Sequence, residues 1–64
     1  MEVMLHILMY LGFLAPGNYT TSQINTMLMV NQQQMTLVQN NTLLLNQAGQ
    51  TSLVGVLVVD DKEN

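Results

Sequence analysis

The fold is decided by one stretch of the sequence, residues 20–49, which reads TTSQINTMLMVNQQQMTLVQNNTLLLNQAG. Thr20 can accept a hydrogen bond from a backbone N–H of the first turn, and Gln23 can reach back to the N–H of Thr20, as in a capping box. Gly49 can adopt the left-handed conformation that often ends a helix. Because no proline or glycine lies between these signals, we expect one long amphipathic helix over residues 20–49.

The spacing of apolar residues gives this helix two adjacent seams. Steps that alternate between four and three residues are typical of a heptad pattern. The first seam consists of Ile24, Leu28, Asn31, Met35, Val38, Thr42 and Leu45. The second seam consists of Met27, Val30, Gln34, Leu37, Asn41, Leu44 and Ala48. Two seams suit a helix with neighbours on both sides, so we expect a coiled coil or helical bundle formed with other copies or another subunit. The alternative is an ordinary core helix of a small domain.

The first fifteen residues, MEVMLHILMYLGFLA, are apolar almost all round a helix. A helix of this kind is buried in protein or in lipid. We expect a short helix over residues 1–15 that packs against other subunits. Insertion of residues 3–15 into a membrane is the alternative, although a usual span needs about 20 residues. His6 has no nucleophile or orienting carboxylate beside it in the sequence, which favours a structural role.

A turn and a strand flank the central stretch. Pro16, Gly17 and Asn18 predict a turn over residues 16–19, which leaves open whether the two helices form a hairpin or continue at an angle. Residues 51–59, TSLVGVLVV, are rich in valine and predict a short strand. Gly55 is expected at a bulge or at a close backbone approach. Residues 60–64 are expected to form a solvated acidic tail.

The predicted strand is apolar on both faces, so we expect it to be buried. Its interface residues are Leu53, Val54, Val56, Leu57 and Val58. An exposed strand of this kind invites pairing with another chain. Since no other segment has comparable β character, we expect its partner strand to come from another copy or from a different protein.

Composition narrows the class of function. The chain has 64 residues and no cysteine, so it forms one domain at most and cannot be held by disulfides. No Asp, Glu, Lys or Arg lies between Glu2 and Asp60, and the whole chain contains one lysine and no arginine. Nucleic-acid binding through phosphates is therefore not expected. A body without charges suits a protein assembly or a membrane.

The sequence contains no nucleotide-binding loop, zinc-protease motif or pair of carboxylates placed for catalysis. We expect a mainly α protein that is not an enzyme and has no cofactor, metal or small-molecule substrate. Its partners would be copies of itself or larger structural proteins. In composition the chain is similar to small accessory components of virus and phage particles, so we expect a virion protein of the minor capsid, tail or cement-like kind. The alternative is a small membrane-associated protein.

Overall fold

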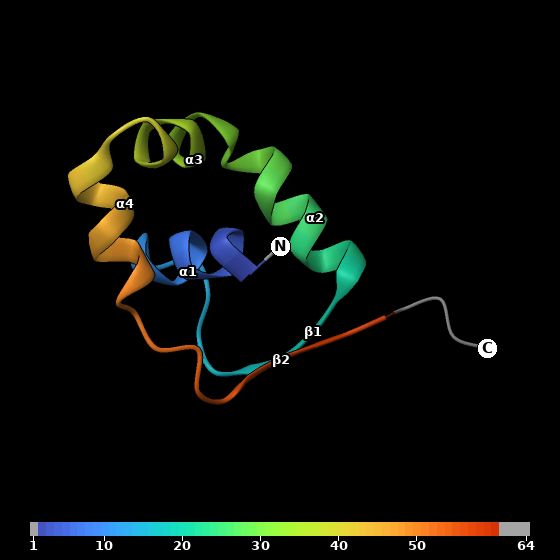
Figure 1. The fold of residues 1–64 in the computed structure, drawn as a ribbon. Coiled ribbons are helices and arrows are strands. Elements are labelled where there is room, and N and C mark those ends of the chain that lie inside the picture. Colours follow the sequence, from blue (N-terminus) through green and yellow to red (C-terminus); the bar gives the residue numbers. More distant parts are fainter. Residues whose placement is uncertain (1, 61–64) are drawn as a thin grey trace.

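The computed structural model describes residues 2–60. In chain order, the elements of this range are α1 (Glu2–Tyr10), β1 (Gly17–Thr20), α2 (Thr21–Val30), α3 (Gln32–Gln39), α4 (Thr42–Gly49) and β2 (Val56–Val59). Helices α2, α3 and α4 form an arc around α1, and the two strands lie side by side across the open side of this arc (Figure 1). The prediction of a mainly helical fold with a short β segment is confirmed. The single long helix is not observed.

Helix α1 is shorter than the predicted segment of residues 1–15. It ends because Gly12 takes a φ of +87°. The N–H of Gly12 donates to the carbonyl of Met9 across 3.1 Å, and the N–H of Phe13 donates to the carbonyl of Leu8 across 2.9 Å. This pair of bonds is a Schellman motif, which favours glycine at its left-handed position. Gly12 lies within an apolar run of the sequence. The prediction followed this run and extended the helix past Gly12 to residue 15.

The start of α2 follows the sequence prediction. The N–H of Gln23 donates to Thr20 Oγ1 across 3.1 Å, and the N–H of Thr20 donates to Gln23 Oε1 across 2.8 Å. Both bonds of the capping box are therefore formed. Ile24, on the first turn, is fully buried. The local signal at this position was sufficient to place the beginning of the helix.

The prediction of one continuous helix over residues 20–49 is wrong, and the first break is at Asn31. Its backbone has φ −107° and ψ 26°, away from helical values. Its side-chain Nδ2 donates to the carbonyl of Met27 across 2.9 Å, and its backbone N–H donates to the same carbonyl across 3.0 Å. An asparagine amide that competes for helix carbonyls is a recognised cause of such breaks.

The second break is at Asn40 and Asn41. Asn41 has an extended backbone, with φ −122° and ψ 108°, and its Oδ1 accepts a hydrogen bond of 3.1 Å from the N–H of Leu44. It is therefore the N-cap of a new helix, a position that asparagine favours. At the other end, α4 continues through Gly49 to a cap at Gln50, where φ is −90°. The left-handed stop predicted at Gly49 is not used.

The two strands pair within the chain. Strands β1 and β2 are parallel, with Gly17 opposite Val56 and Thr20 opposite Val59. The N–H of Gly17 donates to the carbonyl of Gly55 across 2.8 Å. The predicted partner from another chain is therefore wrong for this edge of β2. The segment expected to be a turn over residues 16–19 instead supplies the partner strand, and the observed strand β2 is shorter than residues 51–59.

Gly55 marks a close backbone approach, as the sequence predicted. Its φ is +89°, and a Cβ at this position would lie 3.0 Å from Pro16 Cβ. The predicted acidic tail lies outside the described residues except for Asp60, and Met1 of the predicted first helix also lies outside them.

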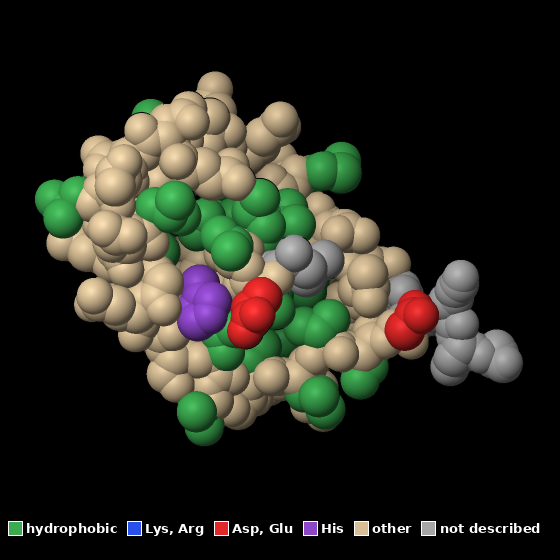
Figure 2. All heavy atoms as spheres, viewed as in Figure 1, with side chains coloured by type: hydrophobic (Ala, Val, Ile, Leu, Met, Phe, Trp, Pro, Cys, Tyr) green, Lys and Arg blue, Asp and Glu red, His purple; other side chains and the backbone are tan. Residues whose placement is uncertain are grey.

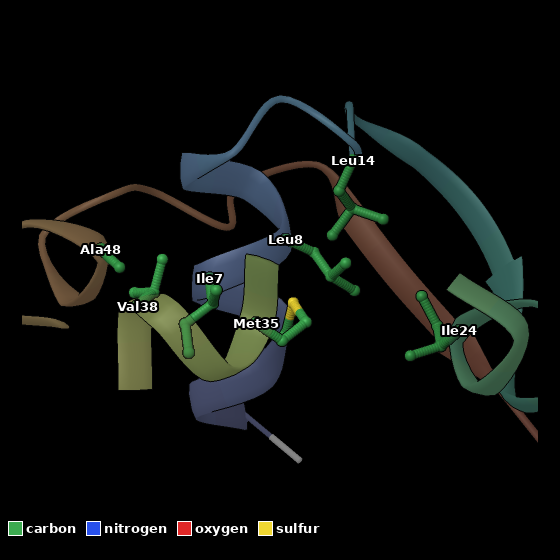
Figure 3. Packing of buried hydrophobic residues seen from close by; sticks show 7 residues of the cluster. All are labelled: Ile7, Leu8, Leu14, Ile24, Met35, Val38 and Ala48. Atoms are coloured by element: carbon green, nitrogen blue, oxygen red, sulfur yellow. The ribbon is translucent and has the colours of Figure 1, made fainter. Parts of the chain in front are cut away.

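The core is built around α1. Its buried apolar residues are Ile7, Leu8, Leu14, Ile24, Met35, Val38 and Ala48 (Figure 3). Ile7 lies on the side of Val38 and Ala48, whereas Leu8 lies toward Leu14. The chain exposes 4314 Å² of surface, close to the roughly 4,100 Å² expected of a folded 7.1 kDa monomer. A domain of this size buries only about 60% of its unfolded surface, so its own core gives limited stability.

Candidate interaction surfaces

The described surface consists mostly of uncharged side chains. Among residues 2–60, no three His, Cys, Asp or Glu side chains gather as a metal site would require. In the same range, no helix combines the length and apolar character needed to cross a bilayer. On the face shown in Figure 2, hydrophobic side chains (green) lie among uncharged polar side chains and backbone (tan). These groups form contacts by packing and by neutral hydrogen bonds.

His6 is half-buried between α1 and the segment that follows α4. Its Nδ1 lies 3.4 Å from Thr51 Oγ1, and the Thr51 hydroxyl donates to the carbonyl of Ala48 across 2.7 Å. The same hydroxyl lies 3.3 Å from the carbonyl oxygen of His6, so both the ring and the backbone of His6 lie beside Thr51. The contact joins α1 to the end of α4, an arrangement consistent with the structural role expected for His6.

A second polar contact joins the same two helices. The hydroxyl of Tyr10 donates to Gln47 Oε1 across 2.7 Å. Sequence reasoning did not pair these residues, because nothing in the sequence places the end of α1 beside α4. With the His6 contact, it holds α4 against α1 at two points.

An apolar cleft of about 160 Å³ opens beside His6 between α1 and α4. It is lined by Val3, His6, Ile7, Leu45, Ala48 and Gly49. Pockets for cofactors and drug-sized ligands usually measure about 300–1,000 Å³. The cleft therefore matches one apolar side chain better than it matches a cofactor.

The first predicted seam faces the chain's own core. Ile24, Met35 and Val38 are buried, and Leu28 and Leu45 are partly buried against them. Asn31 is half-buried at the first break and Thr42 is exposed at the start of α4. The apolar side chains of this seam are thus already covered within the chain's own core, which matches the alternative of core helices in a small domain.

The second predicted seam is divided between core and surface. Met27 and Leu44 are partly buried against the core. Val30 and Leu37 remain 75% and 68% exposed. The breaks at the asparagines turn the three helices relative to one another, so a seam drawn on one straight helix no longer lies on one face. Val30 and Leu37 stay available for contact with another molecule.

The predicted strand residues are also divided between two faces. Val56 and Val58 pack against the core, and Leu53 is partly buried. Leu57 and Val59 point to the other face and are exposed, and Val54, in the turn before β2, is exposed as well. Parallel sheets usually have both faces covered. Within residues 2–60, this small sheet is covered on one face, by the core, and Leu57 and Val59 remain exposed on the other.

The outer edge of each strand has one backbone N–H that is already bonded within the chain. On β2, the N–H of Val56 donates to the carbonyl of Leu53 across 3.0 Å. On β1, the N–H of Thr20 is bonded to Gln23 Oε1 within the capping box. The Tyr19 hydroxyl donates to the carbonyl of Ala15 and accepts from its N–H, which closes the loop before β1. The sequence analysis did not predict this Tyr19 contact. The one available indication was an aromatic residue shortly after a Pro-Gly pair.

Comparison with known protein families, with characterised proteins and with solved structures finds no match for this chain.

Proposed function

We propose that the chain is a non-enzymatic structural component that functions by assembling with copies of itself or with larger structural proteins. The observation that carries the proposal is the combination of a charge-free body with large apolar side chains on its surface. No Asp, Glu, Lys or Arg lies between Glu2 and Asp60. The most exposed of the large apolar side chains are those of Met29, Val30, Leu37, Leu43 and Val54.

The lack of charges and the exposed apolar side chains both favour contact with another protein. A soluble monomer usually carries charges of both signs over its surface and keeps apolar patches small. Burying a Val, Leu or Met side chain is worth about 1.5–3 kcal/mol relative to exposure. Contact with another protein would cover these side chains without removing any charge from water. A small domain with a limited core would gain stability from the same contact.

Within this class, we favour a minor component of a virus or phage particle, for example a capsid, tail or cement-like protein. The support is compositional: helices rich in Asn, Gln and Thr, without charges, suit a subunit that occupies a fixed position among larger proteins.

The second candidate is a small membrane-associated protein that inserts residues 3–15. The burial of Ile7 and Leu8 in the core argues against it, because insertion would remove the residues around which the other helices pack. Contact between a lipid surface and the exposed apolar side chains of α2, α3 and α4 is a separate hypothesis.

One experiment separates the candidates. The purified chain is examined without detergent by sedimentation velocity over a wide concentration range, and in parallel by flotation with neutral lipid vesicles. Assembly predicts a sedimentation coefficient that rises with concentration and no flotation. A chain that stays monomeric and floats with the vesicles would favour the membrane candidate and contradict the proposal.

A further inference from the structure

The sulfur atoms of this chain belong entirely to its methionines. The sequence has six methionines and no cysteine, and five of the six lie within the described residues 2–60. A methionine thioether can take up one oxygen atom to become a sulfoxide, which turns a flexible apolar side chain into a polar one. Because the sulfur must meet an oxidant from solution, the exposure of each side chain decides where this reaction takes place.

The five described methionines differ widely in exposure. Met29, on α2, is 74% exposed and is not among the residues that pack in or against the core cluster. Met35, on α3, is 4% exposed and belongs to that cluster. The other three are partly buried against the core: Met4, Met9 and Met27. Met29 is therefore the one described methionine whose side chain lies mainly in solvent.

Two of the less exposed methionines have a further reason to resist oxidation. The Sδ atom of Met4 accepts a hydrogen bond from Gln39 Nε2 across 3.6 Å, which engages the sulfur lone pairs that would attack an oxidant. At Met35, a sulfoxide would place a polar oxygen among apolar side chains, where an unpaired polar group is costly. The structure thus disfavours reaction at Met4 and Met35 and leaves Met29 open to it.

We propose that Met29 is a modification site, at which hydrogen peroxide oxidises the folded chain and thereby weakens its assembly. The proposal rests on the assembly role proposed above and adds oxidative regulation to it. A lone pair of Met29 Sδ attacks one peroxide oxygen, so that an S–O bond forms while the O–O bond breaks. The proton of the transferred hydroxyl passes to the departing hydroxide, which leaves as water. The sulfur is oxidised by two electrons, and the peroxide is reduced by two.

Oxidation of Met29 leaves the fold intact. The elements that hold α2 in place lie at its other end, where Thr20 and Gln23 form the capping box and Ile24 is fully buried. The sulfoxide oxygen at an exposed position accepts hydrogen bonds from water, so no polar group is left unpaired. The reaction therefore changes the surface of the chain and not its core.

The changed surface is one on which the proposed assembly depends. Met29 precedes Val30, which is 75% exposed, and both belong to the exposed apolar side chains of the uncharged body. Contact with another protein gains free energy from burying a methionine side chain. A sulfoxide buried in the same contact requires a hydrogen-bond partner or carries a penalty. Oxidation at Met29 therefore weakens the contact without adding a charge to it.

The site is tested by treating the full natural chain with dilute hydrogen peroxide and following each described methionine by peptide mass spectrometry. We expect Met29 to gain an oxygen atom about tenfold faster than Met35, in line with their exposed fractions of 74% and 4%. The same reaction in concentrated urea is the control, because unfolding removes the difference in exposure and should make the two rates similar. Equal rates in the folded chain, or faster reaction at Met4 than at Met29, would overturn the assignment of the site.

The consequence for assembly is tested with Met29→Leu, which keeps an apolar side chain of similar volume and removes the thioether. Sedimentation velocity is measured before and after peroxide treatment. We expect the affinity of the natural chain to fall about tenfold on oxidation, with unchanged circular dichroism, and that of Met29→Leu to stay the same. The matched control is Met27→Leu on the same helix, which retains Met29 and should respond to peroxide as the natural chain does. Loss of assembly in the oxidised Met29→Leu chain would contradict the role of Met29.

Failure of this inference is distinguishable from failure of the proposed function. If the natural chain associates and does so equally well with Met29 fully oxidised, assembly stands and its regulation through Met29 is wrong. If the untreated natural chain does not associate, the proposed function fails its own test and the regulation fails with it. The relative oxidation rates of Met29 and Met35 decide the modification site in both cases.

Discussion

Pro16 and Gly55 are in close contact: a Cβ at position 55 would lie 3.0 Å from Pro16 Cβ. The contact lies where the two strands begin, next to the hydrogen bond from the N–H of Gly17 to the carbonyl of Gly55. The left-handed φ of +89° at Gly55 turns the chain into β2 at this point. The junction of the two strands therefore depends on a residue without a side chain.

Replacement of this glycine is expected to destabilise the fold. Gly55→Ala adds a methyl group against Pro16 and holds a non-glycine residue at positive φ, so we expect a loss of about 1–3 kcal/mol in the free energy of unfolding. Gly49→Ala is the matched control, because nothing lies within 4 Å of its Cβ position and the residue is helical. The control should gain about 0.5–1 kcal/mol. Urea unfolding followed by circular dichroism measures both, and equal stability of the two variants would contradict the geometry of the junction.

The capping box predicts a second, more local effect. Thr20→Ala removes the oxygen that accepts from Gln23 and should lower stability by about 1 kcal/mol. Thr26→Ala, in the middle of α2, removes a hydroxyl that donates to the carbonyl of Ser22. This bond does not support the helix, so we expect the control to be neutral or slightly stabilising. A Thr20 variant as stable as the Thr26 variant would show that the box contributes nothing.

Predictions from local sequence signals were more accurate than the prediction from the heptad periodicity. The capping box at Thr20 and the close approach at Gly55 depend on a few neighbouring residues, and both are formed. The long helix depended on a heptad pattern drawn through Asn31 and Asn41. Periodicity treats an asparagine at such a position as one polar member of a seam. The same side chain can bond to the backbone and end the helix, as that of Asn31 does through the carbonyl of Met27.

The partner of β2 could not be derived from the sequence for a related reason. The segment that forms β1 begins with two turn-forming residues, Gly17 and Asn18. It ends with two residues that favour strands, Tyr19 and Thr20. The two strands of this parallel pair lie far apart in the chain. Nothing in the sequence of one strand therefore indicates which segment pairs with it. Of the predicted interface, Ile24, Met35 and Val38 lie in the core, whereas Val30 and Leu37 lie on the surface. A straight-helix seam could not distinguish these two groups.

The break before α4 gives a test that separates the folded arrangement from a continuous helix. Asn41→Ala removes the side-chain oxygen that accepts from Leu44 and should cost about 1 kcal/mol. Asn41→Asp keeps an acceptor at the N-cap and should retain stability. In a continuous helix, alanine at this position would instead stabilise the chain. Thermal unfolding of the three proteins therefore decides between the two, and a gain in stability for the alanine variant would contradict the break.

The exposed residues of the second seam give a test of assembly that leaves the core intact. Val30→Glu combined with Leu37→Glu places two charges where apolar side chains are exposed, so we expect weaker assembly with little change in the free energy of unfolding. An unpaired charge is costly to bury in an interface. Gln33→Glu, a single charge on the same helices, is the control and should assemble nearly as the natural chain does. Assembly of the double variant at natural affinity would exclude this surface from the contact.

The most direct test of an assembly role is the mass of the complex that contains the natural chain, isolated from its source without detergent. Native mass spectrometry or light scattering gives both the copy number and the identity of the partners. We expect a particle much heavier than the 7.1 kDa of one chain, with a defined number of copies of it. A chain recovered as a 7.1 kDa monomer, or released only when lipid is dissolved, would contradict the assembly role.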